Sequence, residues 1–431
     1  MKFPNKLVIA ALLGVVLLAA VTAFASAKST KTSAVSGSVS IVGVWTGPEE
    51  KSFNAVLAGF KKANPGVKVS YKSTGDNTPT VLATAVAGGN PPDLAAVSQP
   101  GLVSDFQKKG ALKNIDYAKA ALAKNYPADI AKIGVIGGHV YGFLIKGANK
   151  STVWYNVAAF KNAGVKAPKT WPALVSAANT IKSSGTPAFS VGGADGWTLT
   201  DLFENIYLRQ AGPAKYDKLS KHTIKWTDTS VVKALKTMGT ILQGGNIAGG
   251  TSGALQTDFP TSVSNVFAAT PKASMVIEGD FVPGVAGEGN PLKPETGFNV
   301  FPFPSIGGSG PAVVGGGDLV VLFKDNPAAK AFVEYLTTPE ASEIWAKRGG
   351  FSSPNKKVDA SVYPDPIQQT TAGAIGEAET FRFDLSDLQP SAFGGTVGQG
   401  LFKLFQDFLK SPTDIDGITT KMEAAAAKAF G

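Results

Sequence analysis

Two close pairs of carboxylates are the groups in this sequence most able to do chemistry. They are Asp201 with Glu204, and Glu278 with Asp280. A retaining glycoside hydrolase holds two such groups roughly 5 to 5.5 Å apart and uses them to cleave a glycosidic bond. The same groups can instead accept hydrogen bonds from sugar hydroxyls without any reaction. Spacing in the sequence does not decide between hydrolysis and binding, so both stay open at this point.

Other catalytic signatures are missing from the sequence. The motifs of serine hydrolases, zinc proteases and phosphate-binding loops do not occur, and the 2 histidines, His139 and His222, lack metal-ligand spacing. The glycine run at 315–317 is not followed by a helix start with Lys, Ser or Thr, so we interpret it as clearance for the backbone. We therefore expect no catalytic residue, no metal and no cofactor, and a protein that is not an enzyme.

Tryptophans in polar, glycine-containing surroundings indicate a binding surface. A sugar presents apolar C–H faces and a rim of hydroxyls, so its receptors need flat rings and planar polar groups. For Trp45 and Trp197 we favour binding over core packing, and for Trp154 neither role is favoured. Trp226 and Trp345 lie inside regular helical or strand patterns and are assigned to packing.

Alternating strands and helices position the first of these groups. The pattern predicts strands at 39–44, 67–71 and 93–97, with helices between them. Strands that alternate with helices pair in parallel, and ligands bind beyond the carboxyl ends of such strands. The side chains at these ends are those of Trp45, Asp76, Asn77 and Gln99. An aromatic ring, a carboxylate and two amides should therefore converge on one rim of the sheet.

A second region follows in which helices dominate. Residues 138–156 form two extended pieces around a polar break, which we interpret as a crossover between domains. Helical patterns occupy 171–208 and 229–242, and extended segments return at 273–277, 298–303 and 318–322. The chain is therefore expected to cross between two lobes more than once.

The N-terminus carries the pattern of a secretory signal. Lysines precede the apolar run 7–23, which ends in small residues up to Ala27. Cleavage after Ala27 gives a signal peptide of residues 1–27, followed by a flexible polar leader at 28–38. Because the apolar run is long for a signal, retention as an uncleaved anchor is the alternative. We predict export, to the periplasm or to the extracellular face of the cytoplasmic membrane.

Composition excludes several classes of protein. With 0 Cys, the chain has no disulfide, no thiolate metal site and no lipoprotein anchor. The 41 Lys and Arg exceed the 32 Asp and Glu, but the lysines are scattered, whereas nucleic-acid binders cluster them. We therefore expect no nucleic-acid partner. About 400 residues after processing exceed what one hydrophobic core serves, so two domains are expected.

One phrase of the sequence resembles a known family. Residues 85–93, Ala-Val-Ala-Gly-Gly-Asn-Pro-Pro-Asp, resemble bacterial extracellular solute-binding proteins of the carbohydrate class, which include maltose- and α-glucoside-binding receptors. The phrases at 153–156, 277–281 and 383–387 support the resemblance, which runs from about Val39 to the C-terminus. The marker phrase itself is interpreted as a turn between helix and strand and not as a ligand contact.

This resemblance implies a fold and its division. The fold class is α/β, a two-lobed periplasmic-binding-protein fold of the type II kind, with a hinge crossed several times and a ligand cleft between the lobes. Residues 39–148 and 273–323 would form the N-terminal lobe 1, and residues 149–272 and 324–431 the mainly helical lobe 2.

The resemblance also implies ligand-binding positions. Matched residue by residue, the expected set is Trp45, Glu50, Asp76, Asn77, Gln99, Trp154, Trp197, Glu204, Glu278, Asp280, Asp318, Arg382 and Asp384.

The function implied is that of the substrate-binding component of an ABC importer. Such a protein would capture a sugar, an oligosaccharide or α-glucoside, and deliver it by hinge closure. Its partners would be the sugar and the transmembrane permease subunits with their cytoplasmic ATPase, and we expect a monomer. Two alternatives remain: a binding protein for a non-sugar solute such as a polyamine, and a secreted glycoside hydrolase.

Overall fold

Three parallel strands begin the fold, and a helix follows each of them. β1 (Gly37–Gly43) pairs in parallel with β2 (Val67–Ser73) and with β3 (Leu94–Val97). The helices that follow in chain order are α1 (Gly47–Ala63), α2 (Thr78–Ala87) and α3 (Pro100–Lys108). In α1 the residues at helical spacing, from Phe53 to Phe60, are buried against the sheet. The predicted parallel arrangement of this region is confirmed.

We describe the protein from a computed structural model in which residues 35–243, 245–286 and 292–431 are described. The predicted signal peptide at 1–27 and the leader up to residue 34 lie outside these residues. β1 begins at Gly37, so the predicted leader at 28–38 overlaps the start of this strand.

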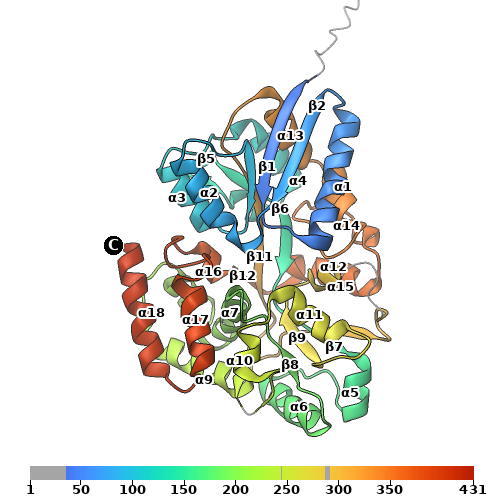
Figure 1. Cartoon of the computed structure of the whole chain (residues 1–431), viewed down its shortest axis with the longest axis vertical. Coiled ribbons are helices and arrows are strands. Elements are labelled where there is room, and N and C mark those ends of the chain that lie inside the picture. The colour runs from blue at the N-terminus through green and yellow to red at the C-terminus, as the bar shows by residue number, and fades with distance from the viewer. Residues whose placement is uncertain (1–34, 244, 287–291) are drawn as a thin grey trace, which may run out of the picture. The chain divides into compact units, whose positions relative to one another are not determined.

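The first sheet contains strands from distant parts of the sequence (Figure 1). Its order is β12-β11-β3-β1-β2, and β6 (Gly142–Asn149) pairs with β11 off this path. β11 (Ala312–Leu322) runs antiparallel to β3 and to β6, and parallel to β12 (Thr380–Phe383). The sheet is therefore mixed, with its parallel half at β1, β2 and β3.

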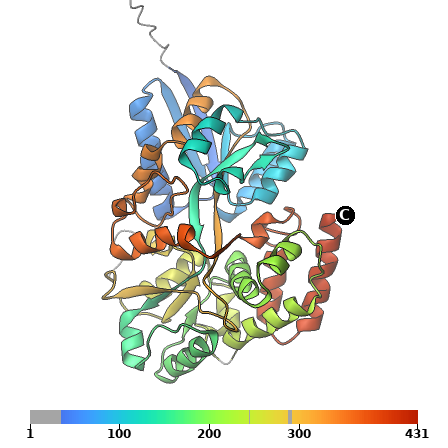
Figure 2. The same cartoon turned by 180° about the vertical axis from the view of Figure 1, so that it is seen from behind.

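A second sheet has the order β10-β7-β9-β8. Its strands are β7 (Thr152–Asn156), β8 (Phe189–Ser190), β9 (Met275–Glu278) and β10 (Phe298–Pro302). β7 runs antiparallel to both β9 and β10. A separate short hairpin joins β4 (Val135–Ile136) to β5 (His139–Val140). Seen from behind, the long strands of the first sheet extend toward the second (Figure 2).

Helices complete both halves of the structure. The remaining helices are α4 (Lys119–Asn125), α5 (Val157–Ala163), α6 (Trp171–Ser183), α7 (Trp197–Ala211), α8 (Pro213–Ser220), α9 (Thr229–Leu242), α10 (Gly250–Ala254), α11 (Phe259–Phe267), α12 (Val282–Ala286), α13 (Pro327–Leu336), α14 (Pro339–Ala346), α15 (Pro366–Glu377), α16 (Leu385–Leu388), α17 (Gly400–Lys410) and α18 (Ile415–Phe430). Short 3₁₀ turns occur at η1 (Gly75–Asn77), η2 (Asp116–Ala118), η3 (Ile130–Lys132) and η4 (Ala360–Val362).

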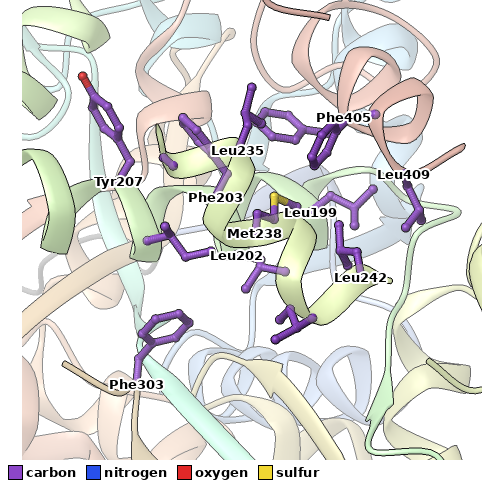
Figure 3. Packing of buried hydrophobic residues seen from close by; sticks show 14 of the residues in the cluster. Leu199, Leu202, Phe203, Tyr207, Leu235, Met238, Leu242, Phe303, Phe405 and Leu409 are labelled. Atoms are coloured by element: carbon purple, nitrogen blue, oxygen red, sulfur yellow. The ribbon is translucent and has the colours of Figure 1, made fainter. Parts of the chain in front are cut away.

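A large hydrophobic core surrounds α7 (Figure 3). Phe203 of α7 stacks on Tyr207 and on Trp226, with ring centroids 5.4 and 5.8 Å apart. Met238 of α9 and Phe405 of α17 belong to the same cluster. Burial on this scale fixes the direction of α7, whose first residue faces the cavity described below.

In the described residues the chain passes from one sheet to the other at two places, and it leaves the first sheet once more after β12. It crosses from β6 to β7 at residues 150–151 and from β10 to β11, and it continues from β12 into α16 and α17. At the first crossing, the Ser151 backbone N–H donates to Asn149 Oδ1 at 2.9 Å, and the Val314 N–H donates to Ser151 Oγ at 2.9 Å. The predicted interpretation of 138–156 as a crossover agrees with this path.

Strand pairing and packing differ from the predicted lobe boundaries at two places. The predicted lobe 1 includes β9 and β10 within residues 273–323, but these strands pair with β7 of the second sheet. The predicted lobe 2 includes Phe332 of α13, but its ring packs against Phe60 of α1, with 4.9 Å between the ring centroids. The sequence pattern identifies a strand or helix and does not identify its partner. The residue boundaries of the two lobes remain a proposal.

In the three described ranges, no helix combines the length and the apolar character needed to cross a bilayer.

Gly101 in α3 provides a test of how closely α3 packs on the segment that follows α16. A Cβ at this position would lie 1.8 Å from the Gln389 carbonyl oxygen, just after α16. Alanine normally favours a helix by about 1 kcal/mol over glycine. We predict that Gly101→Ala instead lowers the free energy of unfolding by about 1–3 kcal/mol, because backbone must move. Thermal or urea unfolding measures this.

Gly253→Ala in α10 is the matched control, since its Cβ would meet only Ala248 O at 3.6 Å. This variant should be as stable as the wild type or slightly more so. Equal stability of the wild type and Gly101→Ala would contradict the close packing of α3 on the segment after α16.

Candidate ligand-binding site

A cavity of about 390 Å³ lies between residues of the two sheets and their helices. This volume falls in the range of small-molecule sites. Its lining residues are Val44, Trp45, Thr46, Gly47, Pro48, Glu49, Gly75, Asp76, Pro79, Ser98, Gln99, Lys146, Ala148, Lys150, Asp195, Trp197, Asp258, Phe259, Pro260, Phe281, Val285, Gly317, Asp318, Asp387, Gly395 and Phe402. Residues at the carboxyl ends of β1, β2 and β3 are among them, as the sequence predicts.

Asp318 on β11 organises the wall that belongs to the first sheet. Its Oδ2 accepts a hydrogen bond from Trp45 Nε1 at 2.7 Å, and its Oδ1 accepts one from Ser98 Oγ at 2.6 Å. The Trp45 ring packs edge-on against Trp345, 4.9 Å between centroids, and is only 1% exposed. Trp45 therefore lines the cavity as a fixed wall whose N–H is already engaged.

Lys146 on β6 lies between two carboxylates of the same wall. Its Nζ donates to Glu49 Oε1 at 2.5 Å and lies 3.6 Å from Asp318 Oδ2. Burial raises the pKa of Glu49, and Lys146 opposes this rise. Burial alone would lower the pKa of Lys146, but Glu49 and Asp318 raise it above its usual value. The lysine therefore stays an ammonium.

Trp197, the first residue of α7, forms the opposite wall. Gly196 precedes it with φ of 85°, and a Cβ at Gly196 would lie 2.6 Å from Phe402 Cβ, so this turn requires glycine. The Trp197 ring packs edge to face on Phe259 and Phe281, with centroids 4.9 and 6.1 Å apart. The ring is half-buried and lines the cavity, so it offers an aromatic surface to the C–H groups of a ligand.

Lys150, in the crossing from β6 to β7, lies close to Trp197. Its Nζ donates to Asp384 Oδ2 at 2.6 Å and to Asp201 Oδ1 at 3.1 Å, and lies 4.0 Å from Asp387 Oδ2. It is also 5.5 Å from the centroid of the Trp197 ring. Burial opposes the charge of Lys150, but these carboxylates raise its pKa well above its usual value. Burial raises the pKa of Asp387 in turn.

Carboxylates of both walls meet near Trp197. Asp76, after β2, lines the cavity with Trp197, and the Trp197 side chain opposes a rise in the pKa of Asp76. Asp76 is exposed at the cavity surface, and desolvation by the surrounding protein raises the pKa of its carboxyl. Asp195 Oδ2 accepts a hydrogen bond from the Phe259 N–H at 2.6 Å. Burial, with the charge of Asp76, raises the pKa of Asp195 to about 7. Asp258 also lines the cavity.

Part of the predicted site lines the cavity. These residues are Trp45, Asp76, Gln99, Trp197 and Asp318. Gln99 Oε1 is buried and has no hydrogen-bond partner among the described residues. Glu50 and Asn77 are sequence neighbours of the lining residues Glu49 and Asp76 but are not part of the lining.

Other predicted residues are buried behind the cavity. Trp154 is fully buried, and its Nε1 donates to Thr152 Oγ1 at 2.9 Å and to the Gly279 carbonyl at 3.0 Å, so it is a core residue. Glu278 and Asp280 are 2% and 3% exposed and do not line the cavity. The prediction of ligand contact by these three residues is not matched by their positions.

Two further predicted acids, Glu204 in α7 and Asp384 before α16, bind protein groups. Glu204 accepts hydrogen bonds from the N–H groups of Leu385 and Ser386 at 2.7 and 2.9 Å. Asp384 binds Lys150 and caps α16 through Asp387 N–H. Neither Glu204 nor Asp384 is in the lining.

Arg382 makes a two-point ion pair with Asp217, at 2.6 and 2.9 Å, and is likewise outside the lining. The guanidinium is therefore occupied by the protein.

Several lining residues were missed by sequence reasoning. They are Glu49, Ser98, Lys146, Lys150, Asp195, Asp258, Phe259, Phe281 and Asp387. Glu49 and Ser98 lie at the same strand ends as predicted residues, so the strand-end rule could have found them. The lysines carry no such signal, because their role depends on carboxylates far away in the sequence.

A metal site and a hydrolase site both fit this arrangement poorly. Oxygens of Asp201, Glu204 and Asp384 lie within 4.8 Å of one another. Lys150 and backbone N–H groups already bind these carboxylates, so they act as acceptors for protein donors. The carboxylate pairs that suggested glycoside hydrolysis, Asp201 with Glu204 and Glu278 with Asp280, are not in the cavity lining.

Two linked sheets with a cavity between their residues form a two-lobed α/β fold that could hold a small ligand. Residues 46–343 match the family model of the bacterial extracellular solute-binding protein, and the chain belongs to this family. The predicted family and fold class are thus confirmed.

Individual relatives cover most of the chain. It is 34% identical over 84% of its length, and 81% of the relative, to the "Alpha-glucosides-binding periplasmic protein AglE" of Rhizobium meliloti. It is 33% identical over 84% of its length, and 87% of the relative, to the "Osmoprotective compounds-binding protein GgtB" of Synechocystis sp.. An uncharacterized ABC transporter extracellular-binding protein of Pyrococcus horikoshii is 26% identical over 89% of this chain and 86% of its own.

A solved structure supports the fold. A chitin oligosaccharide binding protein superposes with a TM-score of 0.79 at 21% identity, covering 92% of this chain and 99% of that one.

The buried position of Asp280 predicts a pH-dependent stability. Burial raises the pKa of this carboxyl to about 7, although Ser352 donates a hydrogen bond to it. Between about pH 4 and pH 7 the folded protein keeps a proton that the unfolded chain releases, so this group's contribution to stability falls as pH rises. Asp280→Asn removes the effect. We predict that its stability relative to wild type increases from pH 5 to pH 7, by up to about 1.4 kcal/mol per pH unit.

Asp359→Asn is the control, because hydrogen bonds from Ser361 lower the pKa of that exposed carboxyl. Its stability difference from wild type should stay constant over the same pH range. A constant difference for Asp280→Asn as well would show that Asp280 is ionised in the folded protein throughout.

Proposed function

We propose that the protein is the substrate-binding component of an ABC importer, and that it captures a sugar, such as an α-glucoside or oligosaccharide, in the cavity between its sheets. The observation that carries the proposal is one cavity bounded by the Trp197 ring and by several carboxylates. Aromatic rings receive the C–H face of a sugar, and carboxylates accept hydrogen bonds from its hydroxyls. Relatives named for α-glucosides, for osmoprotective compounds and as an ABC transporter component support the same class of function.

The charge of the lining favours an uncharged ligand. The lining carboxylates are Glu49, Asp76, Asp195, Asp258, Asp318 and Asp387, and they outnumber the lining lysines, Lys146 and Lys150. Both lysines already bind carboxylates. An anionic ligand would therefore find both lining lysines already paired with carboxylates, whereas a neutral polyol needs no such cation.

Contacts across the cavity support a closing motion. The Ser391 N–H, in the segment after α16, donates to Asp105 of α3 at 3.0 Å, and Trp197 and Asp76 line the cavity from opposite walls. Such contacts form only when the two sides approach each other, so a ligand held by both sides would shift the population toward the closed state.

A non-sugar solute is the second candidate. The excess of lining carboxylates also suits a cation such as a polyamine, and one relative is named for osmoprotective compounds. A secreted glycoside hydrolase is disfavoured, because the close carboxylate pairs of the sequence are outside the lining.

The importer function determines partners and location. The protein would bind permease subunits after closure and would act as a monomer outside the cytoplasm, without a lipid anchor, since the chain has 0 Cys. It would catalyse no reaction and need no cofactor.

Calorimetric titration tests the proposal directly. We expect the protein from Lys28 onward to bind at least one of methyl α-glucoside, maltose and trehalose with a Kd of about 1 µM or below, and to leave the sugar intact. Trp197→Ala should weaken binding about tenfold or more, because it removes the aromatic surface. A glucuronide of the bound sugar should bind at least about tenfold more weakly.

Trp226→Phe serves as the control, because Trp226 is fully buried in the core around α7. It should leave the Kd unchanged in the folded fraction. Cleaved sugar would support the hydrolase, and binding of spermidine without any sugar would support the non-sugar receptor.

Export can be checked by mass spectrometry of the protein recovered from outside the cytoplasm. Cleavage after Ala27 predicts a mature N-terminus at Lys28. An intact N-terminus retained in the membrane fraction would instead indicate an uncleaved anchor.

A further inference from the structure

Asp387 is a buried carboxylate turned toward the cavity. It lines the cavity and is 4% exposed. Its backbone N–H donates to Asp384 Oδ1 at 3.0 Å, but within the described ranges no donor makes a hydrogen bond to its side-chain oxygens. The nearest cation, Lys150 Nζ, is 4.0 Å away, which is too long for a hydrogen bond. A carboxylate this little exposed and without a protein donor favours a hydrogen-bond donor from the cavity.

Lys150 has a donor to spare at the same place. An ammonium carries three N–H donors, and the protein accepts hydrogen bonds from it at Asp201 and Asp384. The remaining N–H has no such acceptor within hydrogen-bond distance among the described residues. Because Lys150 also lines the cavity, a ligand atom can reach this donor.

The separation of the two groups suits a hydroxyl. An oxygen about 2.8 Å from both Lys150 Nζ and Asp387 Oδ2 makes two hydrogen bonds of ordinary length across the 4.0 Å gap. A hydroxyl can accept one hydrogen bond and donate another, which a carbonyl, an ether or an amine cation cannot do in this sense.

We propose that Lys150 and Asp387 together hold one hydroxyl of the ligand, with Lys150 donating to its oxygen and Asp387 accepting its hydrogen. The inference rests on the proposed sugar-binding function. It assigns a direction to the ligand as well. Lys150 Nζ lies 5.5 Å from the Trp197 centroid, so the sugar ring that packs on Trp197 directs this hydroxyl toward the first crossing.

The backbone holds Lys150 firmly in this position. The Lys150 N–H donates to the Val314 carbonyl at 2.9 Å, and its carbonyl accepts from Asn205 Nδ2 at 2.9 Å. Gly316 leaves room for the aliphatic chain, since a Cβ there would lie 2.8 Å from Lys150 Cε. A donor fixed in this way loses little conformational entropy when the ligand binds.

Calorimetry with deoxy sugars tests the pair. The probe is whichever of methyl α-glucoside, maltose and trehalose the wild type binds most tightly, together with its monodeoxy derivatives. We expect one derivative to bind wild type about tenfold or more weakly than the parent, because it lacks the held hydroxyl. Asp387→Asn should weaken binding of the parent about tenfold and bind the parent and this derivative with nearly equal affinity. A structural effect alone would weaken the binding of both sugars and preserve the ratio of their Kd values.

Lys150→Met should likewise bind the parent sugar and the deoxy derivative with nearly equal affinity. Because it leaves Asp201 and Asp384 without their cation, melting curves must show that it folds, and Asp387→Asn decides the question if it does not. Asp129→Asn, at an exposed carboxylate outside the lining, is the control and should retain the wild-type ratio.

The outcomes separate the two proposals. Sugar binding by wild type with the same deoxy discrimination in Asp387→Asn would overturn the hydroxyl contact and leave the sugar function standing. Failure of wild type to bind any of the three sugars would overturn this inference and count against the α-glucoside assignment on which it rests.

Discussion

Carboxylates can be buried together only if cations or hydrogen-bond donors compensate their charge. This protein meets that constraint with lysines on one strand and its extension: Lys146 binds Glu49 and lies near Asp318, and Lys150 binds Asp201 and Asp384. β6 and the residues after it are also the first crossing between the sheets. The wall of the cavity and the connection between the two halves are therefore made by the same residues. Any shift of the crossing moves charged groups that face the ligand.

Most of the secondary structure could be predicted from the sequence, because it depends on local patterns. The apolar spacing in α1 and the turn before β3 are read over a few residues, and the parallel start of the sheet follows from their alternation. The position of the site at the carboxyl ends of those strands could also be predicted, and Trp45, Asp76 and Gln99 do line the cavity. These predictions needed no knowledge of distant contacts.

The rest of the site could not be read in this way. Trp154 has the same polar neighbours in sequence as a binding tryptophan, but β7 lies between β9 and β10 and buries its ring. In the sequence Glu204 could accept hydrogen bonds from a sugar, but in the structure its carboxylate accepts them from backbone N–H groups of α16. Lys150 appears as a break between strands, and only the pairing of β11 with β6 brings Asp384 and Asp387 to it. In each case the role of the residue depends on which distant segment of the chain packs against it, and the local sequence does not show this.

β11 has a further consequence for the way the chain folds. This strand pairs with β3 and β6, which precede it by long stretches of chain, and with β12, which follows α15. Non-local pairing of this kind gives a high contact order and slows folding. A chain that emerges N-terminus first has β1, β2 and β3 available early, but their edge at β3 stays unpaired until residue 322 has appeared. During synthesis or translocation that open edge is where assistance from other proteins would be most valuable.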